Sequence, residues 1–223
     1  MTEESIAKKE YQLSILIPSL TERIDVVSKL IKHIQTQIDD CKANDKVQII
    51  VSMDNRSVPL KDKRNKAQKR ARGKYLCHID DDDWVADNFI KVLLEHIPKA
   101  NDADVICYNQ LAKLDKGKQI IVKPSLNAPL DLQPRGNHVN AAMRGTVNDQ
   151  IPEYMRVPWQ WSCWRTELVR DVFRSDSNSG IKCEDINWLQ RVFLENPSSQ
   201  YIIDETLHIF NGDREDCESA CGW

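Results

Sequence analysis

The sequence predicts an α/β fold in which a mostly parallel sheet is flanked by helices, with a smaller, mixed sheet region in the C-terminal part. Over the first half of the chain, short apolar runs alternate with segments whose apolar residues recur at helical spacing. The runs are rich in β-branched residues, which favour buried strands, and strict alternation of strand and helix produces parallel strands covered on both faces. With 223 residues, 41% of them hydrophobic, the chain can build one domain with a substantial core.

Each element of the first half follows from its own pattern. Strands are expected at four apolar runs, 13–17, 47–53, 75–79 and 104–108. Helices are expected where apolar or small residues repeat every three or four positions, at 24–38, 61–72 and 89–97. In the basic helix, Ala67 and Ala71 are expected to face the core, and Gly73 is expected to end the helix.

The second half of the chain is less regular. A charged turn at 113–118 predicts a hairpin between strands at 105–111 and 119–122. Residues 124–158 include many Pro, Gly and Asn without a clear period, so a long loop is expected there. Helical spacing returns at 185–193, and two short strands, at 201–203 and 207–210, are expected to complete the fold.

Composition argues against several classes of protein. The net charge of −3 and the pI near 6.0 do not suit a protein that binds DNA mainly through its phosphates. The seven cysteines are scattered, with no CxxC pair, so free thiols in a reducing compartment are expected. No apolar run is long enough to span a bilayer, and residues 1–10 are polar, so we expect a cytoplasmic protein without a membrane anchor.

Three polar segments, 18–23, 54–57 and 80–83, directly follow predicted strands. Because the carboxyl ends of parallel strands meet at one edge, where such sheets bind ligands, these segments are expected to gather there. The last segment is a run of four aspartates, Asp80 to Asp83. Like charges this close need a cation, and Mg²⁺ or Mn²⁺ binds carboxylate, water and phosphate oxygens. We favour a metal–diphosphate site over the alternative, a solvated acidic loop.

The residues around this run resemble those of glycosyltransferases of the GT-A fold, family 2 type. The positions that match in order and spacing are Lys63-Arg64-Asn65, Ala67, Ala71-Arg72-Gly73-Lys74-Tyr75 and Ile79-Asp80-Asp81-Asp82-Asp83-Trp84. The resemblance implies a single GT-A domain over 1–223, with a nucleotide-sugar-binding half at 11–110 and an acceptor-binding half at 111–223. It also implies a DXD motif in which Asp80 and Asp82 flank the metal, with Asp82 the direct ligand. Asp81 belongs to the donor site in this interpretation, and Asp83 hydrogen-bonds the donor sugar.

The resemblance extends to the loop after the first strand. Leu16-Ile17-Pro18 matches the family's strand and proline, which implies donor contacts for Pro18, Ser19 and Glu22. The Tyr-Asn pair that usually follows the proline is absent here.

Two further donor contacts follow from the resemblance. Asp54 corresponds to an acid that pairs with the nucleobase, although an Asp-Asn turn would have the same sequence. Arg64 is expected to contact the donor diphosphate, for which a planar guanidinium is well suited. The other cations between 61 and 74 are expected to form mostly a solvated face.

The catalytic base is expected in the second half. Glu184-Asp185 resembles the family's Glu-Asp motif, which opens a helix near the acceptor, and this implies that Asp185 is the base. Acids in a first helical turn are also stabilised by the helix dipole, which is the alternative explanation. His208 is a candidate third metal ligand, although a strand histidine is more often structural. The role of Trp159, Trp161 and Trp164 is left open.

Together these residues predict a metal-dependent hexosyl- or pentosyltransferase that uses Mn²⁺ or Mg²⁺ and a nucleoside-diphosphate sugar, with a UDP-sugar favoured. A single base without a second nucleophile favours inversion. The acceptor is a saccharide or glycan, or a hydroxymethylated base in DNA, because 19–23 and 63–65 resemble compact, phage-like members of the family. The alternatives are a nucleotidyltransferase, which the absence of glycine in 18–23 disfavours, and a non-catalytic nucleotide-sugar-binding module. The oligomeric state is left open.

Overall fold

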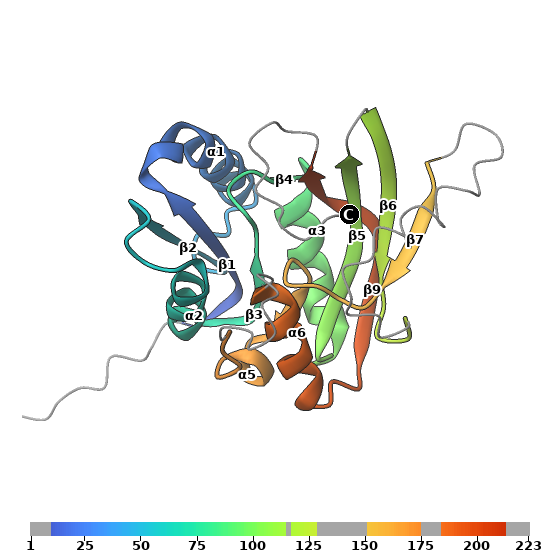
Figure 1. Ribbon diagram of the computed structural model, residues 1–223. Coiled ribbons are helices and arrows are strands. Elements are labelled where there is room, and N and C mark those ends of the chain that lie inside the picture. Colours follow the sequence, from blue (N-terminus) through green and yellow to red (C-terminus); the bar gives the residue numbers. More distant parts are fainter. Residues whose placement is uncertain (1–9, 115–116, 129–150, 175–183, 213–223) are drawn as a thin grey trace, which may run out of the picture.

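The structure is a computed structural model and describes residues 10–114, 117–128, 151–174 and 184–212 (Figure 1). The elements of the first half, in chain order, are β1 (Tyr11–Leu20), η1 (Thr21–Arg23), α1 (Ile24–Asp40), β2 (Val47–Asp54), α2 (Leu60–Arg70), β3 (Gly73–His78), β4 (Trp84–Val85), α3 (Phe89–His96) and η2 (Ile97–Ala100). Strand β1 pairs in parallel with β2 on one side and with β3 on the other. The parallel sheet predicted for this part of the chain is therefore confirmed.

The second half extends the same sheet with strands of both directions. Its elements, in chain order, are β5 (Val105–Leu114), β6 (Lys118–Pro124), β7 (Glu153–Arg156), β8 (Cys163–Arg165), α5 (Thr166–Val169), α6 (Glu184–Leu194) and β9 (Gln200–Asn211). The strands lie in the order β2-β1-β3-β8-β5-β6-β7, and β9 pairs with β5 and β4. The predicted β5–β6 hairpin and the helix α6 are both confirmed.

Two predictions for the second half are wrong. The segment 124–158 is not a loop throughout, because 153–156 form β7, which pairs in parallel with β6; residues 129–150 lie outside the described part of the chain. The two short strands expected at 201–203 and 207–210 are one strand, β9. Its pairing with β5 shifts register around Asn109, and this bulge accommodates the exposed Asp204 and Glu205 that interrupt the apolar pattern.

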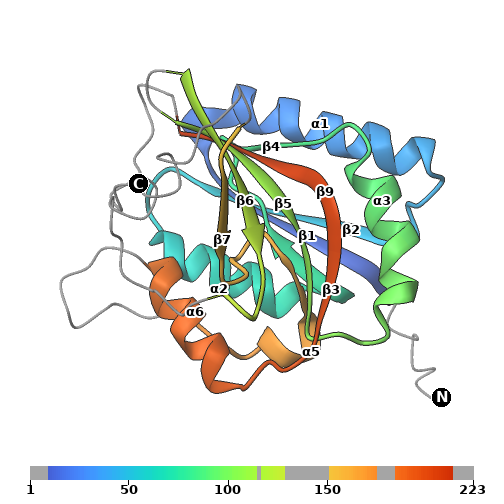
Figure 2. The same ribbon diagram turned by 90° about the vertical axis from the view of Figure 1, so that its right-hand side faces the viewer.

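Helices cover both faces of the sheet, as Figure 2 shows. One core lies between the sheet and the helices α1 and α3, and the other lies under α2, α5 and α6. Helix α1 faces the first core with Val27, Leu30, Ile34 and Ile38, which are at most 2% exposed, because their spacing forms one apolar stripe. No helix in the described ranges has the length and apolar character required to cross a membrane.

Gly73 has a role other than the predicted one. The helix α2 already ends at Arg70, and Gly73 is the first residue of β3. A Cβ at this position would lie 2.5 Å from the backbone of Leu13 and Ser14 on β1. Only glycine permits this approach, and the Gly73 amide donates to Ser14 Oγ at 2.8 Å. The residue therefore fixes β3 against β1 and, with it, the polar turn that follows β3.

Candidate functional site

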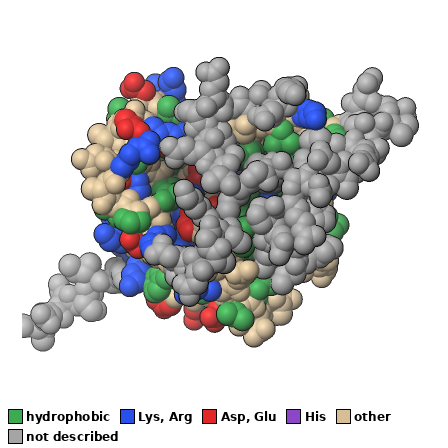
Figure 3. Space-filling model, viewed as in Figure 1, with side chains coloured by type: hydrophobic (Ala, Val, Ile, Leu, Met, Phe, Trp, Pro, Cys, Tyr) green, Lys and Arg blue, Asp and Glu red, His purple; other side chains and the backbone are tan. Residues whose placement is uncertain are grey.

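The three polar segments after β1, β2 and β3 lie together, as predicted. Ser19 Oγ donates to Asp81 Oδ2 at 2.6 Å, which joins the first segment to the third. Lys63 Nζ donates to the Ser19 carbonyl at 2.8 Å and to Asp54 Oδ1 at 2.6 Å, which joins the first segment to the second. Acidic side chains are visible in a recess near the centre of the face shown in Figure 3.

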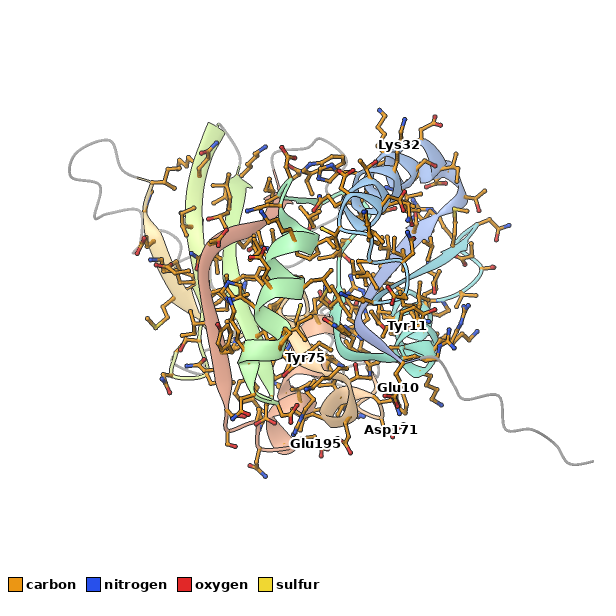
Figure 4. All side chains as sticks on the ribbon, turned by 180° about the vertical axis from the view of Figure 1, so that it is seen from behind. Glu10, Tyr11, Lys32, Tyr75, Asp171 and Glu195 are labelled. Carbon is orange, nitrogen blue, oxygen red and sulfur yellow. The ribbon has the colours of Figure 1, made fainter. Side chains whose placement is uncertain are left out.

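The site lies at the carboxyl edge of the sheet. Tyr11 and Tyr75, which Figure 4 labels from behind, lie at the beginnings of β1 and β3. Both strands run in parallel from there toward the segments that carry Ser19 and the aspartates. This edge is where parallel sheets usually bind ligands.

The four aspartates form a tight turn in which two buried side chains, the inward pair, alternate with two partly exposed ones, the outward pair. The Asp83 amide donates to the Asp80 carbonyl at 3.1 Å. Asp81 and Asp83 are buried, at 5% and 7% exposed, whereas the side chains of Asp80 and Asp82 are 32% and 23% exposed. The inward pair therefore holds the turn in the protein, and the outward pair is the more accessible to a ligand.

The end of β9 supports the inward side of this turn. Asp83 Oδ1 accepts from the Asn211 amide at 3.2 Å, and Asn211 Nδ2 donates to the Asp82 carbonyl at 2.9 Å. His208 Nε2 lies 3.3 Å from Asp83 Oδ2, and its Nδ1 lies 2.9 Å from the amide of Gln110. Both ring nitrogens of His208 thus face protein groups, and the contact is with Asp83 rather than with the outward carboxylates.

Arginines cap the outward carboxylates. Arg64 Nη2 lies 2.5 Å from Asp80 Oδ1, and Arg64 Nη1 contacts both Glu184 and Asp185. Burial by itself would lower the pKa of Arg64, but the three carboxylates raise it, so the guanidinium stays charged. On the other side, Arg23 Nη2 lies 3.0 Å from Asp82 Oδ2.

Asp185 lies in the first turn of α6 beside Glu184. Burial raises the pKa of Asp185 to about 6, Arg64 opposes this rise, and Glu184 adds to it. The carboxylate is therefore ionised above this pH while it keeps a basicity that suits proton transfer near neutrality. Its side chain is 25% exposed.

The residues predicted to contact the nucleotide are partly engaged by the protein. Asp54 accepts from Lys63 and from the Val58 amide, at 2.6 Å each, and the Lys63 hydrogen bond lowers the pKa of Asp54 to about 2. Glu22 pairs with Arg56 at 2.6 Å on the surface. Pro18 lies within β1, opposite Ser52 of β2.

Sequence reasoning missed three residues that hold the site. Lys63 is only 6% exposed, and its position four residues before the buried Ala67 was a signal that it faces inward. Gln160 Nε2 faces Asp80 Oδ2 at 3.5 Å and its Oε1 accepts from Arg174 Nη2 at 2.9 Å. Arg174 Nε lies 3.9 Å from Asp185. No sequence pattern marked Gln160 or Arg174.

The tryptophans divide into core and surface residues. Trp161 and Trp164 are 4% and 0% exposed, and Trp161 stacks on His208 with ring centroids 5.4 Å apart. Trp159 is only partly buried, and the guanidinium of Arg156 lies 3.9 Å from its ring centroid. Core packing therefore accounts for two of the three.

The donor chemistry of the turn fits a hard divalent cation. Asp80 and Asp82 present outward carboxylates, and Mg²⁺ typically takes one or two carboxylates while phosphate and water complete its shell. The part of the chain that the structure describes contains no group of three His, Cys, Asp or Glu residues arranged to hold a metal. Asp80 and Asp82 are therefore the candidate ligands for such a cation.

Comparisons with known proteins identify related sequences and folds. The family model described as Glycosyl transferase family 2 matches residues 14–140, more than half of the chain. Curated proteins give no significant match. The crystal structure of S. aureus TarS 1-349 is similar with a TM-score of 0.56 and 16% identity, over 90% of this chain and 60% of that one. TarS 1-349 in complex with UDP-GlcNAc gives 0.53 and 15%, over 94% and 61%. The chain thus spans about 60% of the length of these structures.

Proposed function

Because the chain belongs to glycosyl transferase family 2, we propose that it transfers a sugar from a nucleoside-diphosphate donor to an acceptor hydroxyl, with a divalent metal and with inversion at the anomeric carbon. One observation supports this proposal above the others. Arg64 contacts Asp80 after β3 and also Glu184 and Asp185 on α6. The predicted metal ligand and the predicted base, 105 positions apart in the sequence (185 − 80), therefore share one cation.

We assign the donor to the half formed by 11–110. Pro18, Ser19, Glu22 and Asp54 lie on the segments that would contact the nucleotide, and Arg64 would bind the diphosphate. TarS 1-349, which shares the fold, has a structure in complex with UDP-GlcNAc, and this supports a UDP-sugar as donor.

We assign the cation to the outward carboxylates of the turn. Asp80 and Asp82 would hold Mn²⁺ or Mg²⁺, which stabilises the negative charge on the departing nucleoside diphosphate when it is bound. Asp81 and Asp83 keep the turn in place through Ser19 Oγ and the Asn211 amide. His208 acts with them, because it contacts Asp83.

Asp185 is the base in this proposal. With a pKa of about 6, it accepts the proton of the acceptor hydroxyl at neutral pH. Arg64 and Arg174 hold its carboxylate from two sides. Inversion requires that the hydroxyl attack the face of the sugar opposite the diphosphate, which the acidic turn would hold.

The acceptor belongs to the half formed by 111–223. We propose a saccharide hydroxyl, for which the partly buried Trp159, the sequence neighbour of Gln160, offers an aromatic side chain. A hydroxymethylated base in DNA is the alternative acceptor, and assays with both acceptor classes distinguish them.

Thermal unfolding with UDP, GDP, CDP and TDP, each with and without Mn²⁺, tests the donor site. Binding to the folded state raises its stability by about 2.7 kcal/mol at a hundredfold excess over Kd. We expect a metal-dependent shift with one nucleotide, UDP, that Asp82→Ala abolishes. Asp87→Ala is the matched control, because this nearby carboxylate is 98% exposed. No shift with any nucleotide would refute the proposal and favour a role outside sugar transfer.

A further inference from the structure

Arg23 has no role in the mechanism above, yet it lies against the acidic turn. It is the last residue of η1, directly before α1. Its Nη1 lies 3.0 Å from Asp81 Oδ1, and its Nη2 lies 3.0 Å from Asp82 Oδ2. A guanidinium that spans two carboxylates supplies the positive charge that such a cluster requires.

The two contacts of Arg23 differ in their surroundings. The side chain of Asp81 is 6% exposed, and Ser19 Oγ also holds it at 2.6 Å, so this contact belongs to the protein interior. The side chain of Asp82 is 23% exposed and that of Arg23 is 24% exposed. The contact with Asp82 therefore lies where a ligand can replace it.

The other outward carboxylate is compensated in the same manner, since Arg64 contacts Asp80. Both outward carboxylates are thus paired with a guanidinium of the protein. A guanidinium and a divalent cation on one carboxylate repel each other strongly at such short range. Because Arg23 already holds Oδ2 of Asp82, its charge weakens the binding of a divalent cation at this carboxylate.

We propose that Arg23 is the resident counter-cation of Asp82, which the divalent cation displaces when it enters with the donor. This inference rests on the proposed function and adds a form of regulation to it. Arg23 weakens metal binding in the donor-free protein, so that metal and donor bind together.

Mn²⁺ binding without nucleotide, followed by the EPR signal of free Mn²⁺, tests the inference. The proteins compared are the wild type, Arg23→Gln and the matched control Arg56→Gln. The control removes the same charge close by, but Arg56 pairs with Glu22 at 2.6 Å. We expect Arg23→Gln to bind Mn²⁺ about three- to tenfold more tightly, and Arg56→Gln to stay within about twofold of the wild type. Adding Asp82→Asn to Arg23→Gln should remove the gain.

Three results would overturn the inference: equal or weaker Mn²⁺ binding by Arg23→Gln, no binding to either protein, or a gain that survives Asp82→Asn. If circular dichroism shows that Arg23→Gln does not fold, Arg23→Lys replaces it, because lysine keeps the charge but cannot span both carboxylates. We expect Arg23→Lys to bind Mn²⁺ about two- to threefold more tightly, and an unchanged affinity would overturn the inference.

The outcome is separable from that of the proposed function. Metal-dependent UDP binding by the wild type, together with unchanged Mn²⁺ affinity in Arg23→Gln, would reject only the role of Arg23. Absence of nucleotide binding by the wild type would reject the proposed function, while the Mn²⁺ titrations would still decide whether Arg23 competes for Asp82.

Discussion

Replacing Arg64 by Met removes the cation that three carboxylates share. The Arg64 side chain is 3% exposed, and the side chains of Asp80, Glu184 and Asp185 are 32%, 20% and 25% exposed. Removing one partner of a fully buried ion pair costs about 3–5 kcal/mol. Because these carboxylates are partly solvated, we expect Arg64→Met to lower the free energy of unfolding by about 2–4 kcal/mol at pH 7.5.

The loss should depend on pH. Burial already raises the pKa of Asp185 to about 6, against an opposing effect of Arg64, so removal of Arg64 raises it further. The folded variant then binds more protons than the folded wild type between pH 5 and 7. Stability of the variant relative to the wild type therefore rises as the pH falls, and the difference should be smaller at pH 5 than at pH 7.5.

Urea unfolding at both pH values measures this prediction. Arg56→Met is the control, because its ion pair with Glu22 joins side chains that are 55% and 59% exposed and should contribute at most about 1 kcal/mol. A loss for Arg64→Met no larger than that of the control, or one that does not change with pH, would show that Arg64 does not hold the three carboxylates together.

Three further predictions concern the site and its support. Asp185→Asn should lower kcat by at least about a hundredfold without weakening UDP binding. The kcat of the wild type should decrease as the pH is lowered below 6, because Asp185 becomes protonated. A flat pH profile would exclude Asp185 as the base. Lys63→Met should weaken UDP binding and lower the free energy of unfolding by about 1–3 kcal/mol, unlike the exposed control Lys66→Met; calorimetry and urea unfolding check both. Gly73→Ala should lower the free energy of unfolding in urea by about 3 kcal/mol. Gly117→Ala should lower it by about 1 kcal/mol, because Gly117 has open space around it and only its φ of +71° disfavours alanine. Equal losses would disprove the role given to the β1–β3 contact.

The fold class and the family were predictable because their signals are local. Apolar runs and helical spacing mark strands and helices wherever one face is buried, and this predicted β1 to β3, α1 to α3, the β5–β6 hairpin and α6. The order of short motifs from Lys63 to Trp84 identified the family, which the family model confirms, and the similarity to TarS confirms the fold. The prediction of two strands in place of β9 was wrong, because two exposed acids at a bulge interrupt the apolar pattern of a single strand.

The same local signals left the contacts of the site undetermined. They indicated that the segments after β1, β2 and β3 meet at one edge, because parallel strands share their direction. They did not indicate that Lys63 joins two of these segments, since the sequence of a basic helix looks the same whether one of its lysines is buried or solvated. The roles of all the predicted site residues in ligand binding and catalysis remain predictions.

What the sequence determined by itself is therefore the strands and helices with a strong local pattern, the family, and the sheet edge at which the three polar segments meet. Only the tertiary structure decided which charges meet. Strand β8 lies between β3 and β5 and pairs with both. Helix α6 packs on the same face of the sheet as α2, which brings Asp185 to Arg64 across 121 positions. Chain periodicity describes which face of an element is buried, but an ion pair depends on where two distant elements are placed relative to each other, and packing of the whole core determines that placement.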